Sequence, residues 1–276
     1  MSLLFLASMG VVAILLGIAS QLPRSSAGYA AILALGIIAG AVVVSFIRGD
    51  EGGPILLVGG VALVWLHRWA GRDRRRLAMA RFARDRGLEF QARNREALSE
   101  DFRLFGRGDG GRVRNVLQGE WDGVPVRAMD YDYFVTRTMW VFYPLKDWRR
   151  FSVAVLDLGA SVPLVIAERN GAAGLASDYM GFHDVQLNSD EFNRRFHVTA
   201  DDREFAYQFF DLGMLRWLLN QPDLLETEVQ GRRALVALAR LEPDQMGRLF
   251  DVAVGFRSHI PALVRRKYHV ADPVVP

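Results

Sequence analysis

The sequence contains no cysteine among its 276 residues. This absence excludes disulfide bonds, thiolate metal sites and cysteine nucleophiles. The spacings of a serine-hydrolase nucleophile elbow, a phosphate-binding P-loop and a zinc-protease helix are also missing. The five histidines are scattered and show no ligand spacing: His67, His183, His197, His259 and His269. We therefore expect no cofactor, no metal site and no recognisable set of catalytic residues.

Charge is scarce in the first 69 residues, and long apolar segments take its place. The charged residues there are Arg24, Arg48, Asp50, Glu51 and Arg68. A transmembrane helix needs roughly 17–25 apolar residues. Three segments fit or approach this length: 3–19, 29–47 and 55–69. We predict that residues 1–70 form three transmembrane helices, which makes the chain a multi-pass protein of the cell membrane.

Two alternatives to three spans stay open at this point. The third segment is short, so it could instead be a buried or re-entrant segment beside two spans. The first segment could be a cleaved signal peptide, although no lysine or arginine precedes it as such a leader would require. Within the second segment, Gly36 and Gly40 form a GxxxG pair, which favours close helix packing and a homo-oligomer.

Positive charge is concentrated directly after the apolar region. The residues concerned are Arg68, Arg72, Arg74, Arg75 and Arg76. Cationic flanks resist translocation, so this end and the domain after it are expected in the cytoplasm. Such a cluster also attracts anionic lipid, at about 1 kcal/mol per charge, although it could serve only to fix topology. Because the net charge of +3 is local in origin, we expect no nucleic-acid partner.

Residues 71–87 are predicted to form a basic juxtamembrane helix that ends at Gly87. Residues 88–276 are predicted to form a soluble α+β domain with an antiparallel sheet. Asp122-Gly123 separates two apolar-rich runs, 113–121 and 124–135, which is typical of a hairpin. Further strands are expected at 139–143, 151–158 and 164–167.

Alternation in the second run places Asp130 and Asp132 on one face of the strand and Met129, Tyr131 and Tyr133 on the other. The aromatic residues nearby are expected to fill the inner face of the sheet: Tyr131, Tyr133, Trp140, Phe142 and Tyr143.

The C-terminal third has a mainly helical pattern. Residues 201–220 are predicted to form one or two amphipathic helices, with Thr199 and Asp202 spaced as a capping pair. A possible hairpin turns near Gln230-Gly231. A further helix is expected after Pro243, kinked or broken at Pro261.

The stretch Ser189 to Val198, which reads SDEFNRRFHV, is followed by the acidic pair Asp201-Asp202 and a segment with Gly213-Met214-Leu215 and Trp217-Leu218-Leu219. This pattern resembles the second half of a bacterial, actinobacterial-type family of membrane-attached proteins that contain a domain of unknown function, mainly over residues 185–220. The resemblance implies membrane attachment with a soluble domain. It implies no activity and no catalytic residues.

These features favour a non-enzymatic, membrane-tethered interaction module that binds a protein partner or the cytoplasmic membrane face. One alternative is an enzyme with an unrecognised polar site built from Asp130, Asp132, His183 or His197. Another is an accessory subunit of a larger membrane complex. Convergence of two or more of these side chains in a pocket would favour the enzyme.

Overall fold

The computed structural model describes residues 74–94, 102–139, 143–171 and 183–271, apart from the side chains of 137–139, 143–145 and 183. The chain divides into two compact units, Met1–Arg75 and Arg76–Pro276. The three apolar segments 3–19, 29–47 and 55–69, together with Gly36 and Gly40, lie outside the described residues.

The expected fold class, three transmembrane helices in front of an α+β domain, is corrected by this structure. Over the described ranges, no helix is long and apolar enough to cross a bilayer. The longest helix in those ranges, α7 (Met246–Ser258), has 13 residues. At 1.5 Å per residue it extends about 20 Å, whereas the hydrocarbon layer is about 30 Å thick. The described chain is instead dominated by an antiparallel sheet with short helices.

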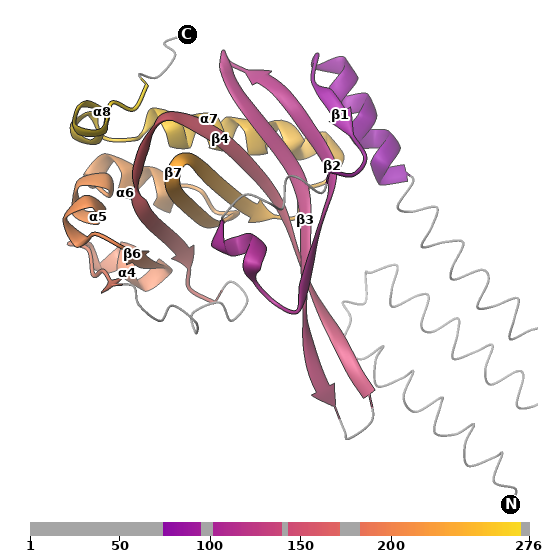
Figure 1. Ribbon diagram of the computed structural model, residues 1–276, viewed down its shortest axis with the longest axis horizontal. Helices are drawn as coiled ribbons and strands as arrows, with labels where there is room; N and C mark the ends of the chain where they lie inside the picture. The colour runs from indigo at the N-terminus through magenta and orange to yellow at the C-terminus, as the bar shows by residue number, and fades with distance from the viewer. Residues whose placement is uncertain (1–73, 95–101, 140–142, 172–182, 272–276) are drawn as a thin grey trace, which may run out of the picture. The chain divides into compact units, whose positions relative to one another are not determined.

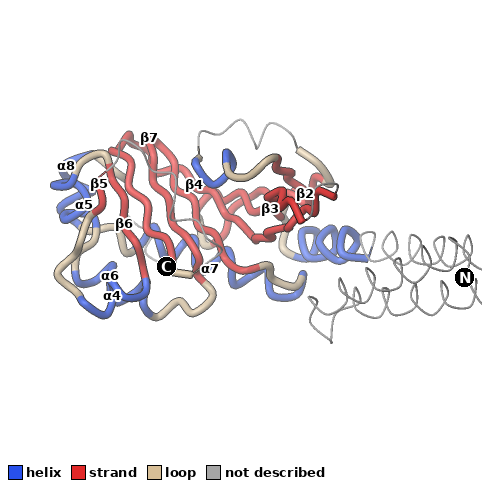
Figure 2. Tube along the Cα trace, turned by 90° about the horizontal axis from the view of Figure 1, so that it is seen from below, coloured by secondary structure: helices blue, strands red, loops and turns tan. Residues whose placement is uncertain are grey.

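The sheet has seven strands in the order β1-β2-β3-β4-β6-β5, and β7 also pairs with β4. Every strand pair is antiparallel. The bounds are β1 (Glu89–Gln91), β2 (Gly110–Trp121), β3 (Val124–Met139), β4 (Tyr143–Arg169), β5 (His183–Asp184), β6 (Phe196–Ala200) and β7 (Leu224–Ala239). Figure 2 shows these strands side by side from β5 to β2. The predicted hairpin at Asp122-Gly123 is confirmed, because these two residues join β2 to β3.

The strands β4 and β7 are long and bent, and β4 curves round β7 (Figure 1). The register between them shifts twice between Asp157 and Val165. Gly159 and Gly231 have φ of +76° and +55°, which glycine tolerates without steric cost. The ends of β7 meet, because the Ala239 N–H donates to the Asp223 carbonyl over 3.1 Å. The possible hairpin near Gln230-Gly231 is therefore present as a bend within β7.

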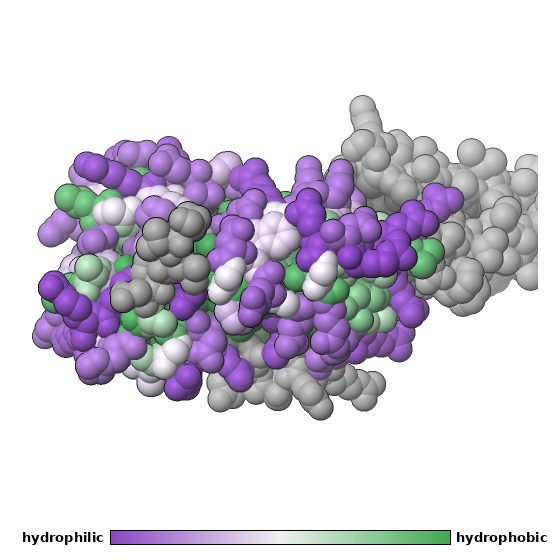
Figure 3. All heavy atoms as spheres, turned by 90° about the horizontal axis from the view of Figure 1, so that it is seen from above, coloured by the Kyte–Doolittle hydropathy of each residue, from purple (hydrophilic) through white to green (hydrophobic). Residues whose placement is uncertain are grey.

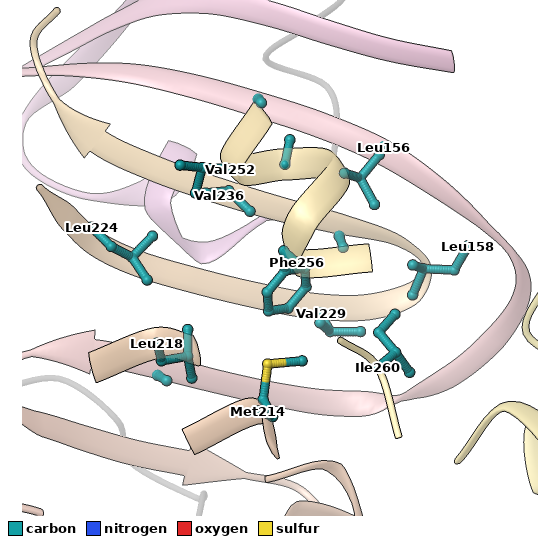
Figure 4. Packing of buried hydrophobic residues seen from close by; sticks show 14 of the residues in the cluster. Leu156, Leu158, Met214, Leu218, Leu224, Val229, Val236, Val252, Phe256 and Ile260 are labelled. Atoms are coloured by element: carbon teal, nitrogen blue, oxygen red, sulfur yellow. The ribbon is translucent and has the colours of Figure 1, made fainter. Parts of the chain in front are cut away.

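Helices cover one face of the sheet, which we call the helix face. Its main core joins α7 to β2, β3, β4 and β7. Figure 4 shows residues of α6 and α7 together with residues of β4 and β7 in this core. The other helices are a helix over residues 74–85 and α4 (Asp190–Arg195), α5 (Arg203–Phe209), α6 (Leu212–Leu219) and α8 (Ala262–Tyr268). The main core includes Leu156, Leu158, Met214, Leu218, Val229, Val236, Phe256 and Ile260.

The opposite face carries a smaller core beneath the short 3₁₀ helix η2 (Arg103–Gly106), and we call it the η2 face. Tyr131 and Tyr133 are buried there beside Phe102, Leu104 and Phe151. Asp130 and Asp132 alternate with the tyrosines and point to the helix face, where they meet Arg240. The predicted alternation along β3 is confirmed.

Local sequence determines where the C-terminal helices begin and end. Asp202 is the N-cap of α5, accepting from the N–H groups of Glu204 and Phe205. The prediction that Thr199 caps this helix is wrong. Thr199 is buried in β6, which pairs with β4 up to Ala200. Residues 201–220 form two helices, α5 and α6. As expected, Pro261 separates two further helices, α7 and α8.

Candidate functional site

Three glutamates are buried together on the η2 face and form what we call the glutamate cluster. Glu168 lies on β4 directly opposite Glu226 on β7, and Glu228 follows two residues later on the same face. Their exposed fractions are 5%, 1% and 0%. Like charges opposite each other in a sheet repel, so this arrangement requires a compensating cation or bound protons.

Arg107, at the end of η2, supplies that cation. Its Nη1 lies 2.7 Å from Glu226 Oε2, and its Nη2 lies 3.1 Å from Glu226 Oε1 and 3.3 Å from Glu168 Oε2. Glu228 instead accepts the backbone N–H of Arg103 over 2.8 Å and that of Leu104 over 3.4 Å. The glutamate cluster therefore fastens residues 102–107 onto the sheet.

Burial also changes the proton affinity of this cluster. Removal of the carboxyl from water raises the pKa of Glu226 to about 8, although Arg107 acts in the opposite direction. Burial likewise raises the pKa of Glu228 to about 7, against the backbone donors of Arg103 and Leu104. The pKa values of Tyr131 and Tyr133 are also raised by burial. Burial therefore favours the protonated form of both carboxyls, whereas Arg107 and the backbone donors favour the charged form.

A second group, the aspartate cluster, lies on the helix face at β3. Arg240 forms ion pairs with both Asp130 and Asp132. Asp132 is also contacted by Arg112 Nε at 3.0 Å and by Arg114 Nη2 at 2.6 Å. The Asn115 side-chain amide donates to Asp130 over 2.8 Å. Because three guanidinium groups meet two buried carboxylates, this cluster is suited to holding strands β2, β3 and β7 together.

The proposed catalytic candidates are only partly brought together. The side chains of Asp130 and Asp132 lie close together, but they form ion pairs with arginine side chains. His197 lies on β6, beyond β4, and its Nδ1 is 3.6 Å from Asp184 Oδ1. His183 belongs to β5, and its side chain is not described. Across the described ranges, no group of three or more histidine or acidic side chains could hold a metal ion.

The arginines predicted to bind anionic lipid lie in and before the helix over residues 74–85. Arg68 and Arg72 fall outside the described residues. Arg74 and Arg76 are exposed, and Arg75 is half-buried. Lipid binding by these residues stays a prediction.

The C-terminal end of this helix is fixed to the sheet unit by aromatic contacts. The Trp121 ring lies 4.7 Å from Phe250 on α7, and the Phe82 ring lies 6.3 Å from both. The Arg86 guanidinium sits 5.2 Å from the Phe82 ring. Trp121 Nε1 donates to Asp251 over 2.8 Å. The last turns of the basic helix are therefore part of the folded unit.

A shallow hollow of about 340 Å³ opens near the β2–β3 turn, with Gln118, Arg127, Asp157 and Arg233 in its lining. Its lining contains neither of the two clusters and none of the histidines whose side chains are described, which are His197, His259 and His269. Figure 3 shows a face on which hydrophilic side chains predominate and apolar ones are scattered. Neither feature resembles an enclosed small-molecule site.

Sequence reasoning missed the glutamate cluster and its partner Arg107. One indication was available, because Glu226 and Glu228 alternate inside an apolar run, which places both on one face of a strand. Glu168 directly follows a run predicted as a buried strand. Their meeting could not be foreseen, since it depends on the pairing of β4 with β7.

No protein-family profile matches the sequence. A search of curated proteins also found no match. Among solved structures, the fold is similar to the crystal structure of the mycobacterial trehalose monomycolate transport factor A, TtfA. The TM-score is 0.51 at 16% identity, and the match covers 75% of this chain and 98% of that chain. At this identity the similarity establishes a shared fold.

Proposed function

We propose that this chain is a non-enzymatic interaction module that works at the cell membrane in the transport of a trehalose glycolipid. The observation that carries the proposal is the fold, because the match spans 98% of a chain named as a trehalose monomycolate transport factor. This chain would take part in the same process, the transport of a glycolipid of that class. It would support that transport by binding through its surface.

The geometry of the two buried clusters supports a structural role for them. Arg107 and Arg240 tie the buried carboxylates to η2 and to the strands. These contacts stabilise the sheet, and both clusters are buried beneath other parts of the fold. Contacts with partners would then be made by exposed side chains.

The proposed location is the cytoplasmic side of the cell membrane. Arg74 and Arg76 are exposed at the start of a helix whose far end is fixed to the sheet unit. With Arg68 and Arg72 they would bind anionic lipid heads, for which each cation contributes about 1 kcal/mol. The sheet unit would thereby be held close to the leaflet, where it could contact a membrane protein partner.

The test is affinity purification of the full chain, tagged after Pro276, from membranes of its host in mild detergent. We expect one membrane protein to co-purify in a constant ratio. We also expect depletion of the chain to reduce transport of labelled trehalose glycolipid. Migration of the chain alone in detergent, together with unchanged glycolipid transport on depletion, would overturn the proposal.

A further inference from the structure

The hollow near the β2–β3 turn lies on the η2 face of the sheet. Five polar side chains line it: Gln118 and Glu120 on β2, Arg127 on β3, Asp157 on β4 and Arg233 on β7. Two positions away on each strand lies a member of the smaller core of this face: Val116, Met129, Val155 and Leu235. Because side chains alternate across a strand, the five polar side chains point to the same face as these core residues. The hollow therefore continues the η2 face beyond the smaller core.

Strand pairing places the polar side chains next to one another. Gln118 lies directly opposite Arg127, and Arg233 lies directly opposite Asp157. Side chains opposite each other in an antiparallel pair have Cβ atoms about 4.5–5.5 Å apart. Arg127 Nε donates to Gln118 Oε1 over 3.4 Å, and the Gly159 N–H donates to Asp157 Oδ1 over 2.6 Å. The fold therefore positions these donors and acceptors without a ligand.

An apolar surface lies between the polar groups. Val155 is directly opposite Arg127 and is 6% exposed, and the Pro125 ring is exposed opposite Glu120. Asp157 keeps 58% of its side chain exposed, so its carboxylate is accessible. The volume of about 340 Å³ is near the lower end of the range for ligand sites, roughly 300–1,000 Å³. The hollow thus offers a small apolar floor bordered by accessible polar groups.

The lining disfavours charged ligands and apolar ligands. Two arginines and two acids line the hollow, so their formal charges cancel. An anion would face Glu120 and Asp157, and a cation would face Arg127 and Arg233, so either would meet like charges. An apolar ligand would remove these charged groups from water without giving them partners. A neutral ligand rich in hydroxyl groups avoids both costs, because each hydroxyl can donate and accept a hydrogen bond.

We infer that the hollow binds a neutral sugar. The C–H face of the sugar ring packs on Val155 and Pro125. The guanidinium groups of Arg127 and Arg233 donate to hydroxyl oxygens, and the carboxylate of Asp157 accepts from hydroxyl groups. Hydrogen bonds to charged groups are stronger than those between neutral groups, which suits a site with few contacts. The inference rests on the proposed function and deepens it, because it gives the sugar headgroup of the transported glycolipid a site on this chain.

The test uses the full chain in a detergent without a sugar headgroup, since such a headgroup would itself compete for the hollow. Saturation-transfer NMR with free trehalose would detect contact between the sugar protons and the chain. We expect transfer to trehalose that falls several-fold when Arg127→Ala and Arg233→Ala are combined. The matched control combines Arg203→Ala and Arg216→Ala, which remove two exposed arginines from α5 and α6 on the helix face. It should keep the transfer of the parent chain.

A second measurement keeps the test valid if the double variant fails to fold. The chain has no cysteine, so a single introduced thiol takes the label alone. Gln118→Cys, carrying an environment-sensitive fluorophore, should change its emission when trehalose is added. Arg216→Cys, labelled in the same way on α6, should not respond.

Parent chain that transfers no saturation to trehalose would overturn the inference. Undiminished transfer in the folded double variant would overturn it as well, and so would displacement of trehalose by inorganic phosphate, because the arginines would then serve an anion. In each of these cases, a co-purifying membrane partner and reduced glycolipid transport on depletion would leave the proposed function standing. Trehalose binding by a chain that has no partner and whose depletion leaves transport unchanged would contradict the proposed function alone.

Discussion

At the residue scale, Arg107 is the guanidinium that bridges Glu168 and Glu226 in the glutamate cluster. Removing one partner of a buried ion pair costs about 3–5 kcal/mol, because the remaining charge stays out of water. We expect Arg107→Met to lower the free energy of unfolding by about that amount. Urea denaturation followed by circular dichroism would measure it.

The control for this substitution is Arg232→Met. Arg232 is exposed and lies 3.8 Å from Asp157, so its removal should change stability by less than about 1 kcal/mol. Equal losses in the two variants would show that the glutamates do not depend on Arg107 for neutralisation.

Glu226 gives the fold a pH dependence of defined sign. Its folded-state pKa of about 8 lies above the ordinary value of 4.5. Between these two values the folded chain binds more protons than the unfolded chain, so the free energy of unfolding falls as pH rises. The slope approaches about 1.4 kcal/mol per pH unit for each proton retained. We expect a lower melting temperature at pH 8 than at pH 5.

The substitution Glu226→Gln should flatten this profile and raise the melting temperature at pH 8 relative to the parent. Glu120→Gln, at an exposed position on β2, should leave the profile unchanged. Thermal scans at four pH values would compare the three chains. A profile that keeps its slope in Glu226→Gln would assign the pH dependence to other groups.

At the element scale, the helix over residues 74–85 is packed on the sheet through Met79 and Ala83, which are buried in the main core. Met79→Ala should therefore cost about 2–5 kcal/mol, the range for methionine in a core. Leu77 lies on the same helix and is 57% exposed, so Leu77→Ala should cost less than about 0.5 kcal/mol. Urea unfolding of both variants would check the difference. A similar cost for both would mean that the helix is not part of the cooperative unit.

Elements that depend on near neighbours were predictable from the sequence. The turn at Asp122-Gly123, the alternation of Asp130 with Tyr131 and the break at Pro261 each follow from a few adjacent residues. The bend that β4 and β7 share could not be predicted, because it depends on the register in which two segments far apart in the chain pair. The expected fold class was corrected, because no helix in the described residues is long and apolar enough to cross a membrane.

At the scale of the whole molecule, the proposed orientation can be tested with reporters fused after Pro276. The arginines near residue 72 resist translocation, so we expect a fluorescent protein to mature there and a phosphatase to stay inactive. Both fusions should be produced in equal amount, as judged by immunoblot. Active phosphatase without fluorescence would place the sheet unit outside and would remove the cytoplasmic leaflet as its surface.

The candidate sites also differ in how far apart their residues lie in the sequence. The arginines at 68–76 could be named from the sequence, since their proximity is local, whereas the glutamate cluster required the assembled sheet. The aspartate cluster lies between these cases. Alternation placed Asp130 and Asp132 on one face, but their partner Arg240 is far from them in sequence and joins them only through β7.

The late position of β7 has a consequence for synthesis on the ribosome. Arg240 and Phe151, which share a hydrogen bond, are 89 residues apart. Until β7 emerges, the edge of β4 that it will cover has no partner, and an unpaired edge of that length recruits other chains. Nascent chains that stall before Leu224 should therefore depend on chaperones, whereas chains released after α7 should not.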